Sequence, residues 1–330
     1  MSKEPSGLNI VEIELTNACN LNCKHCYVDK SIKHTLPDTK VFDLIDEISE
    51  LGVHRLAFTG GEPLLLQNIF KFAKYAKSKK IPTVALMTNG LLISEKNIQE
   101  LKIFDLIQLS IDVPPKEKAH FRIDYSNELS NTIDLLNKNG IAVHLQATIH
   151  RELIKKLDEL SDFINEKKVT LGLNRLILTG SATNLVDEKL KHEELKVALE
   201  KITEYKKKNS SIHCSDPLIF LVDSEKMNLF KKSEPKGIMG GCIAGIATLY
   251  ICSNADVFIC PFVKVPIANV FNEKLSDIWF NNETLAKLRN RKNINGKCGN
   301  CEYRAYCGGC RGASLLKTQS LIESDDNCWL

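Results

Sequence analysis

The chain has 330 residues, of which 43% are hydrophobic and 26% charged, the proportions of an ordinary folded protein. Its formal net charge of +3 at pH 7 gives no electrostatic case for nucleic acid or a membrane surface as a partner. The first residues contain no apolar signal core, and no stretch approaches the apolar length that crosses a bilayer. We therefore expect a cytoplasmic protein, whose 12 cysteines serve metal binding rather than disulfides.

Strand-like and helix-like segments alternate from residue 8 to residue 208. The six predicted strands, which are apolar or alternate apolar with polar residues, lie at 9–15, 55–58, 83–86, 103–109, 141–149 and 169–178. Each is followed by apolar residues at helical spacing. Six successive strand–helix units predict a parallel sheet with right-handed crossovers, two units short of a closed barrel. The predicted fold class is α/β, a partial (β/α)6 TIM-like barrel followed by a small cysteine-rich domain.

The pattern changes after residue 208. Residues 209–235 show little periodicity and are expected to form a linker or bridging segment. Beyond them the chain is rich in cysteine and glycine, with one helical pattern at 275–288, which indicates a domain organised by metal. We therefore expect a barrel at 1–208, the bridging segment at 209–235 and the metal domain at 236–330.

Three cysteines follow the first predicted strand. Cys19, Cys23 and Cys26 have the spacing C-x3-C-x2-C, with Tyr27 directly after the last one. A cubane iron–sulfur cluster normally takes four cysteine ligands, so three thiolates leave one iron with an open coordination position. An open position distinguishes a catalytic metal site from a structural one. A zinc knuckle is the alternative, but His25 lies between two of the cysteines, where it closes the same tetrahedron badly. We expect His25 on the surface of the loop.

This loop resembles the signature of the radical S-adenosylmethionine (SAM) enzymes. The resemblance implies that Cys19, Cys23 and Cys26 bind a [4Fe–4S] cluster whose open iron chelates the amino and carboxylate groups of SAM. An electron from the cluster then cleaves SAM and releases a 5′-deoxyadenosyl radical. Tyr27 is implied to pack near the adenine.

Further motifs of the same family follow the next predicted strands. Gly60, Gly61 and Glu62 match the Gly-Gly-Glu-Pro motif, which contacts the SAM amino group in that family. Glycines let the backbone approach a ligand closely, and a carboxylate accepts hydrogen bonds from an ammonium group. Without the cysteine loop beside it, a Gly-Gly turn before a helix would carry little information.

Polar residues also end the third and fourth strands. In similar enzymes, a serine at the position of Ser110 and a downstream arginine bind the SAM carboxylate and ribose, and Arg122 is the candidate arginine. Asn89 lies at the same rim, and a plain turn is the alternative for it. We therefore expect Asn89, Ser110 and Arg122 to contribute to the SAM site.

Seven more cysteines form a framework near the end of the chain, at Cys242, Cys260, Cys298, Cys301, Cys307, Cys310 and Cys328. It resembles the SPASM domain, which carries two auxiliary [4Fe–4S] clusters. By analogy Cys298, Cys301, Cys307 and Cys328 bind an outer cluster, and Cys242, Cys260 and Cys310 an inner one. Paired zinc knuckles are normally separated by about 15–20 residues, which the short segment between Cys301 and Cys307 does not allow.

Two departures from the SPASM pattern bear on the inner cluster. The cysteine that the family places shortly before Cys242 is missing, so either one iron is open or Cys252 or Cys214 substitutes. A buried apolar thiol is the alternative for those two residues. Ala255 occupies a position that is glycine in the family, which affects a turn but removes no ligand.

The resemblance implies an oxidoreductase that abstracts hydrogen from a substrate, with a peptide or protein side chain favoured: crosslinking, oxidation or epimerisation in an anaerobic cell. One alternative is modification of a haem or haem d1 tetrapyrrole, for which Arg122 and Arg175 are the candidate propionate ligands. Another is a non-catalytic electron carrier, which leaves the three-cysteine loop unexplained. Expected partners are a flavodoxin- or ferredoxin-like electron donor and a separate leader-peptide-binding protein, because the first strand begins near Asn9. The sequence assigns no catalytic acid or base.

Overall fold

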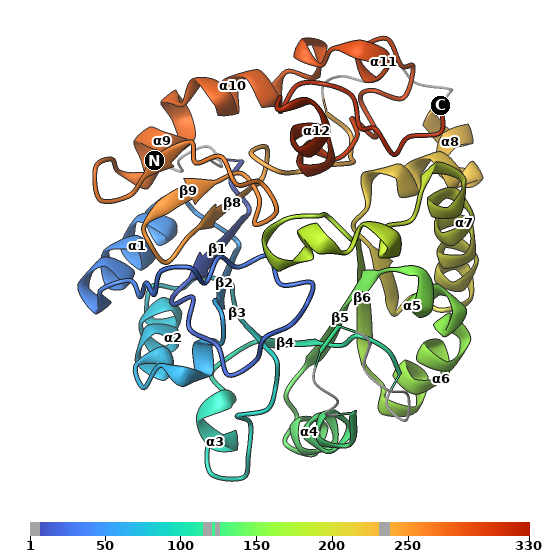
Figure 1. Ribbon diagram of the computed structural model, residues 1–330. Helices are drawn as coiled ribbons and strands as arrows, with labels where there is room; N and C mark the ends of the chain where they lie inside the picture. The colour runs from blue at the N-terminus through green and yellow to red at the C-terminus, as the bar shows by residue number, and fades with distance from the viewer. Residues whose placement is uncertain (1–6, 115–120, 123–125, 231–237) are drawn as a thin grey trace.

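The computed structural model describes residues 7–114, 121–122, 126–230 and 238–330. Its central sheet has ten strands in the order β10-β9-β8-β1-β2-β3-β4-β5-β6-β7. The parallel strands are β1 (Ile10–Glu14), β2 (Arg55–Thr59), β3 (Thr83–Thr88), β4 (Leu106–Ser110), β5 (Val143–Ile149), β6 (Thr170–Arg175), β7 (Ile212–Cys214) and β8 (Thr248–Ile251). The antiparallel strands β9 (Asp256–Phe258) and β10 (Ala268–Asn269) complete one edge. The sheet is curved and unclosed, so the predicted partial barrel is confirmed (Figure 1).

Helices cover the outer face of this sheet (Figure 1). They are α1 (Asp38–Glu50), α2 (Ile69–Ser78), α3 (Ile98–Leu101), α4 (Ser126–Lys138), α5 (Arg151–Lys155), α6 (Leu157–Lys167) and α7 (His192–Lys208). Alternate strand residues are buried in the apolar core with these helices, as Val11 and Ile13 are with Leu44 of α1. The intervening residues face the inside of the curved sheet, which we call the lumen face. Many of them are polar and half-buried, including Glu12 and Gln146.

The chain between residues 209 and 230 is more regular than its weak periodicity predicts. It contains β7, which pairs with β6 in parallel, and α8 (Ser224–Phe230). The barrel sheet therefore gains a seventh strand after the six predicted ones. A strand of three residues is too short to show an alternating pattern, which explains why the sequence did not indicate it.

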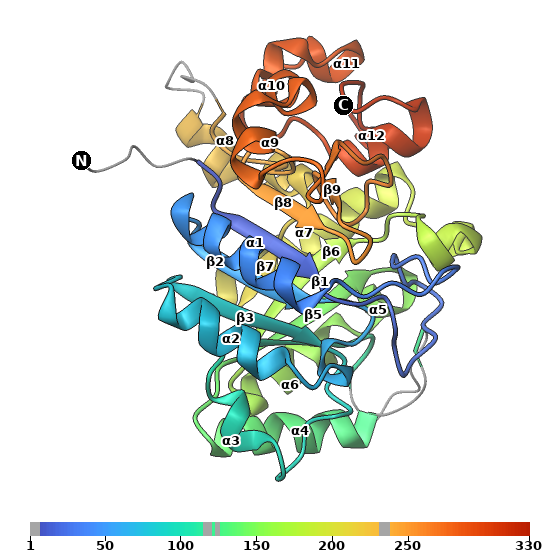
Figure 2. The ribbon, with the colours of Figure 1, turned by 90° about the vertical axis from the view of Figure 1, so that its left-hand side faces the viewer.

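The C-terminal part also adds to the barrel sheet, because β8 pairs with β1 in parallel. The single helical pattern expected at 275–288 is two helices, α9 (Leu275–Asn281) and α10 (Glu283–Arg289), since the side chain of Asn282 caps the second one. They are followed by α11 (Gly296–Gly299) and α12 (Arg311–Thr318). Figure 2 shows this orange and red segment above the strands, on the side away from α3 and α4.

Two buried arginines organise the loops of the C-terminal part. Arg291 donates to the carbonyl oxygens of Arg304, Gly240 and Cys242 at 2.6–3.0 Å. Arg311 donates to the carbonyl oxygens of Leu321 and Glu323 at 2.9 Å and to that of Gly308. Buried carbonyls need donors, and here side chains supply them in place of regular structure. None of the helices among the described residues is long and apolar enough to span a membrane.

Candidate functional site

The three cysteines of the barrel lie on the loop after β1, at the edge where the parallel strands end. Burial raises the pKa of the Cys19 and Cys23 thiols, and the neighbouring thiols of the loop add to the rise. None of the three is in a disulfide. Three thiols within electrostatic reach of one another become ligands only when a cation stabilises their thiolates. The donor set therefore fits an iron–sulfur cluster.

The Gly-Gly turn after β2 packs directly against this cysteine loop. The Gly61 amide donates to Thr16 O at 2.7 Å, and the Glu62 amide donates to Ala18 O at 2.8 Å. A Cβ atom on Gly61 would lie 2.2 Å from Ala18 O, closer than any side chain can come. The motif indicated that the glycines make room for a ligand. The structure shows that they also make room for the backbone of the cysteine loop.

Glu62 is fully buried beneath the loop, and protein donors occupy both of its carboxylate oxygens. Oε1 accepts from Thr88 Oγ1 at 2.7 Å and from the Leu64 amide at 3.0 Å. Oε2 accepts from the Asn89 amide at 2.9 Å. Burial raises the pKa of this carboxyl group. Glu62 thus joins the ends of β2 and β3. Its predicted contact with the ammonium group of SAM would add a fourth donor to these three.

Asn89 and Ser110 lie at the same rim. Asn89 Nδ2 donates to Asn20 Oδ1 at 2.8 Å, inside the cysteine loop. Ser110 is the last residue of β4 and is half-buried. The structure therefore brings Asn89 to the loop, and it places Ser110 at the end of the strand next to β3.

Arg122 and His25 lie against the second cysteine. Arg122 Nη1 is 3.8 Å from Cys23 Sγ, and Arg122 Nη2 is 3.1 Å from His25 Nε2. Burial, with Arg122 as the next cause, lowers the pKa of His25 to about 3, so this histidine is neutral. His25 is half-buried rather than fully on the surface as expected, because the ring of Phe121 lies 5.1 Å from its own. The sequence does not reveal that contact, since residues 121 and 122 lie far from the loop along the chain.

Tyr27 connects the barrel loop to the C-terminal part. Its ring lies 5.4 Å from that of Phe262 and 6.2 Å from that of Tyr250, both at steep angles. Lys264 Nζ lies 5.5 Å from the centre of the Tyr27 ring. Burial raises the pKa of the phenol. The predicted role of Tyr27 beside an adenine stays a prediction.

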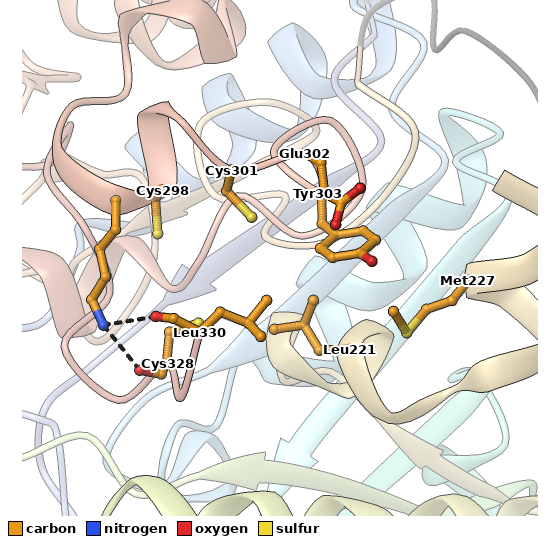
Figure 3. A pocket seen from close by; sticks show the side chains of 9 residues that line it. Leu221, Met227, Cys298, Cys301, Glu302, Tyr303, Cys328 and Leu330 are labelled. Carbon is orange, nitrogen blue, oxygen red and sulfur yellow. Dashed lines mark hydrogen bonds between the residues drawn. The ribbon is translucent and has the colours of Figure 1, made fainter. Parts of the chain in front are cut away.

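The four cysteines predicted as the outer set come together. The thiols of Cys298, Cys301 and Cys328 line a cavity of about 430 Å³, also lined by Leu221, Met227 and Tyr303 (Figure 3). Burial raises the pKa of Cys307, and both Cys298 and Cys328 add to the rise. Four cysteines are the ligand number of a [4Fe–4S] cluster, so this donor set fits one.

The three cysteines predicted as the inner set form a second group. Burial raises the pKa of Cys260, and the nearby thiols of Cys242 and Cys310 raise it further. Burial also raises the pKa of Cys310 to about 12, against the opposing effect of Arg175. The assignment of the seven thiols to an outer and an inner cluster stays a prediction, with which these electrostatic neighbours are consistent.

The two proposed substitutes for the missing ligand, Cys252 and Cys214, each have a carboxylate as a neighbour. Cys252 Sγ is 3.2 Å from Glu14 Oε1, and burial followed by Glu14 raises the pKa of this thiol to about 11. Burial followed by Asp216 raises the pKa of Cys214 to about 12.

Arg175 is held in a buried ion triad beside the inner set. Its guanidinium donates to Asp216 and to both oxygens of Asp325, the latter at 2.9 and 3.1 Å. Asp325 Oδ2 also accepts from the Cys310 amide at 2.8 Å. Arg175 therefore does not face the lumen as a free propionate ligand, because two carboxylates already neutralise it.

A buried network that the sequence did not reveal joins β1 to β8. Glu14 accepts hydrogen bonds from the Tyr250 hydroxyl, from the Ser253 amide at 3.2 Å and from Ser253 Oγ at 2.5 Å. The sequence signal for this network was weak: Glu14 is an acidic residue at the end of a strand in which apolar and polar residues alternate. Glu14 thus fixes the C-terminal part to the strand that leads into the cysteine loop.

A partial parallel barrel with three thiols after its first strand, joined to a domain that gathers seven more, defines an enzyme with metal cofactors. Comparisons with known proteins agree. Residues 13–164 match the model of the radical SAM superfamily, and residues 242–302 match that of an iron–sulfur cluster-binding domain, SPASM. The chain therefore carries a radical SAM domain at 13–164 and a SPASM domain at 242–302.

Similar proteins fall into two groups by name. The chain is 25% identical to the AdoMet-dependent heme synthase of Methanosarcina barkeri, over 97% of this chain and 95% of that one. It is also 25% identical to the mycofactocin maturase MftC of Mycobacterium tuberculosis, over 96% of this chain and 81% of that one. Among solved structures, Streptococcus suis SuiB bound to precursor peptide SuiA matches with a TM-score of 0.80 at 21% identity, over 98% of this chain and 76% of that one.

The family establishes the cofactors. They are a [4Fe–4S] cluster with SAM in the barrel and additional iron–sulfur clusters in the SPASM domain. When bound, the cluster would supply the electron for reductive cleavage of SAM. The residues of this chain position that chemistry at the ends of the strands.

Proposed function

We propose that this enzyme abstracts hydrogen from a peptide or protein side chain, with the SAM cluster held by Cys19, Cys23 and Cys26. Tyr27, Gly60, Gly61, Glu62, Asn89, Ser110 and Arg122 form the SAM site in this proposal. The two thiol groups of the SPASM domain would hold two auxiliary clusters, which would supply electron-accepting groups for the product. Cys242, Cys260 and Cys310 would give the inner cluster three ligands, and Cys252, which donates to Glu14, would not give a fourth.

The observation that carries the peptide proposal is the character of the lumen face. Its middle and upper positions carry the neutral amides Gln108, Gln146 and Asn174, all half-buried. Amide side chains both donate and accept hydrogen bonds, as a peptide backbone requires. Of the arginines expected to bind propionates, Arg175 is neutralised by two aspartates, and Arg122 lies against His25 at the proposed SAM site. Arg55 of β2 is the remaining arginine of these strands, and a tetrapyrrole with several carboxylates would need more cations than this one.

Two partners follow from this proposal. An external flavodoxin- or ferredoxin-like protein supplies the electron, and a separate protein binds the leader of the peptide. Support for a point where electrons enter comes from the cavity at the outer thiols, which the apolar residues Leu221, Met227 and Leu330 also line (Figure 3).

Modification of a tetrapyrrole side chain is the second candidate. It is favoured by the similarity to the AdoMet-dependent heme synthase of Methanosarcina barkeri, which extends over nearly the whole of both chains. A Fe-coproporphyrin III synthase of the same organism is 24% identical over 91% of this chain.

One experiment separates the two candidates. The reconstituted enzyme is incubated anaerobically with SAM and dithionite, either with peptides encoded beside its gene or with iron coproporphyrin III. Mass spectrometry should show loss of hydrogen mass from a peptide and an unchanged porphyrin. Loss of carboxylate mass from the porphyrin, with every peptide unchanged, contradicts the peptide proposal.

A further inference from the structure

A cluster of ionisable side chains lies at the base of the lumen, at the opposite end from the cysteine loop. Its members are Glu12, Arg55, His144 and His213, which we call the basal cluster. Glu12 and Arg55 face inward from neighbouring strands and act on each other electrostatically. Arg55 and His213 both act on His144, although β2 and β5 are separated by two strands. The cluster therefore spans the concave face of the sheet.

The interior of a barrel is usually filled by branched apolar side chains. Here the wall around the basal cluster is polar and closely fitted. His144 Nδ1 lies 2.7 Å from Thr170 Oγ1. A Cβ atom on Gly172 would lie 2.5 Å from Gln146 Oε1 and 2.6 Å from His144 Nε2. The absence of a side chain at Gly172 thus makes room for His144 and Gln146 on the lumen face.

Arg55 is the member of the cluster that has an unsatisfied buried donor atom. Its Nε atom is buried and has no hydrogen-bond partner among the described residues. Glu12 acts on it only at a distance, and no ion pair within 4.0 Å joins the two in the described part of the chain. A buried guanidinium donor without an acceptor costs free energy, which an arriving acceptor recovers. Arginine matches a carboxylate with two parallel hydrogen bonds.

Glu12 does not prevent an anionic ligand from binding. Burial, opposed by Arg55, raises the pKa of Glu12 to about 7, so the carboxyl group is largely protonated below that pH. A protonated carboxyl donates a hydrogen bond to a carboxylate instead of repelling it. The other ionisable side chains of the basal cluster are the imidazoles of His144 and His213. Burial lowers the pKa of His144 to about 4.

We propose that Arg55, with Glu12 beside it, binds a carboxylate of the substrate at the base of the lumen. This inference deepens the proposed function and rests on it for the site of reaction. Arg55 begins β2 and Thr59 ends it, so the rim lies about 13 Å above Arg55 at the rise of a strand. The carboxylate is therefore remote from the carbon that loses hydrogen. It is an anchor that sets which part of the substrate reaches the rim.

Glutarate is the probe for this site, with glutaramide as its uncharged counterpart. Ligand-observed NMR on the reconstituted holoenzyme, without SAM or reductant, compares the wild type with Arg55→Gln and Arg55→Lys. We expect the wild type to bind glutarate and not glutaramide. Arg55→Gln should weaken glutarate binding about 10- to 100-fold, as a lost charged hydrogen bond predicts, and Arg55→Lys should retain part of it. Arg151→Gln, at an exposed arginine, is the matched control and should bind like the wild type.

Equal glutarate binding by the wild type and a folded Arg55→Gln variant overturns the proposal, as does equal binding of glutarate and glutaramide by the wild type. If Arg55→Gln does not fold, the comparison with Arg55→Lys and glutaramide decides. Displacement of glutarate by iron coproporphyrin III, but not by its tetramethyl ester, identifies the carboxylate as a propionate. Displacement by a glutamate-containing peptide identifies it as part of a peptide. Because no turnover is needed, a missing mass change in the activity assay counts against the proposed function alone.

Discussion

The barrel loop and the SPASM domain assemble their thiols by different means. Cys19, Cys23 and Cys26 lie on one short loop, and backbone contacts with the Gly-Gly turn fix its start. The SPASM thiols come from segments between Cys242 and Cys328. Buried side-chain charges hold those segments together, with Arg175, Arg291 and Arg311 as the principal donors.

This difference indicates how each site responds to change. The barrel loop is held by the Gly-Gly turn, Asn89 and Arg122, all of which belong to the barrel, so removal of an ion pair in the SPASM domain should spare it. The SPASM sites depend on buried ion pairs and on arginine-to-carbonyl hydrogen bonds, which are costly once one partner is removed. A single change far along the chain should therefore disturb them.

The largest effect is expected from Cys23→Ala, which separates the two regions by function. It removes one of the three thiols of the barrel loop, so formation of 5′-deoxyadenosine from SAM should be lost. The iron of the SPASM domain should remain. Liquid chromatography of the product and iron analysis of the protein measure both. Cys214→Ala is the control and should keep both, whereas cleavage of SAM by Cys23→Ala would contradict the assignment.

Arg175→Met should affect the SPASM side by leaving Asp216 and Asp325 buried without their cation. Removal of one partner from such a buried group lowers the free energy of unfolding by about 3–5 kcal/mol. Anaerobic denaturation and iron content measure the loss. Arg151→Met removes an exposed ion pair with Glu194 and should change little. A variant as stable as the wild type, with full iron content, would show that the triad does not hold the domain.

His144→Gln tests the polar base of the barrel through pH. Burial, then His213, lowers the pKa of His144 to about 4, below the 6.5 of a free histidine. Between these values the unfolded chain binds more protons, so the stability of the wild type falls as pH drops through this window. The loss should be on the order of 1–3 kcal/mol. The variant should show a shallower fall, and His54→Gln, at an exposed histidine, should follow the wild type. An unchanged slope in His144→Gln would contradict the burial of this imidazole.

The smallest effect is expected at Ala255, which stands where the family has glycine. Its φ of 72° lies in the left-handed region, and the residue is fully buried. Ala255 therefore adopts the left-handed conformation that suits glycine, at a cost in backbone strain of about 1–2 kcal/mol. Ala255→Gly relieves this strain but loses a buried methyl group and frees the unfolded chain. The free energy of unfolding should change by no more than about 1 kcal/mol. A larger loss, with loss of SPASM iron, would mean that the methyl group is needed for packing.

Much of the barrel could be predicted from the sequence because its signals are local. The six strands have apolar or alternating patterns, and the cysteine spacing and the Gly-Gly turn are continuous motifs. The seventh strand is too short for a pattern, and β8 joins β1 across more than two hundred residues. The contact of Phe121 with His25 and the Arg175 triad also join distant segments. Such pairings are set by tertiary packing, for which one sequence carries no local signal.

Electron paramagnetic resonance of the reduced protein, with and without SAM, tests the central claim most directly. The claim is that the barrel loop alone binds SAM, while the SPASM thiols hold separate clusters. SAM should change one component of the wild-type spectrum, and that component should be absent from Cys23→Ala. The remaining components should not respond to SAM in either protein. A SAM-dependent change in the spectrum of Cys23→Ala would place SAM at the SPASM domain and contradict the account.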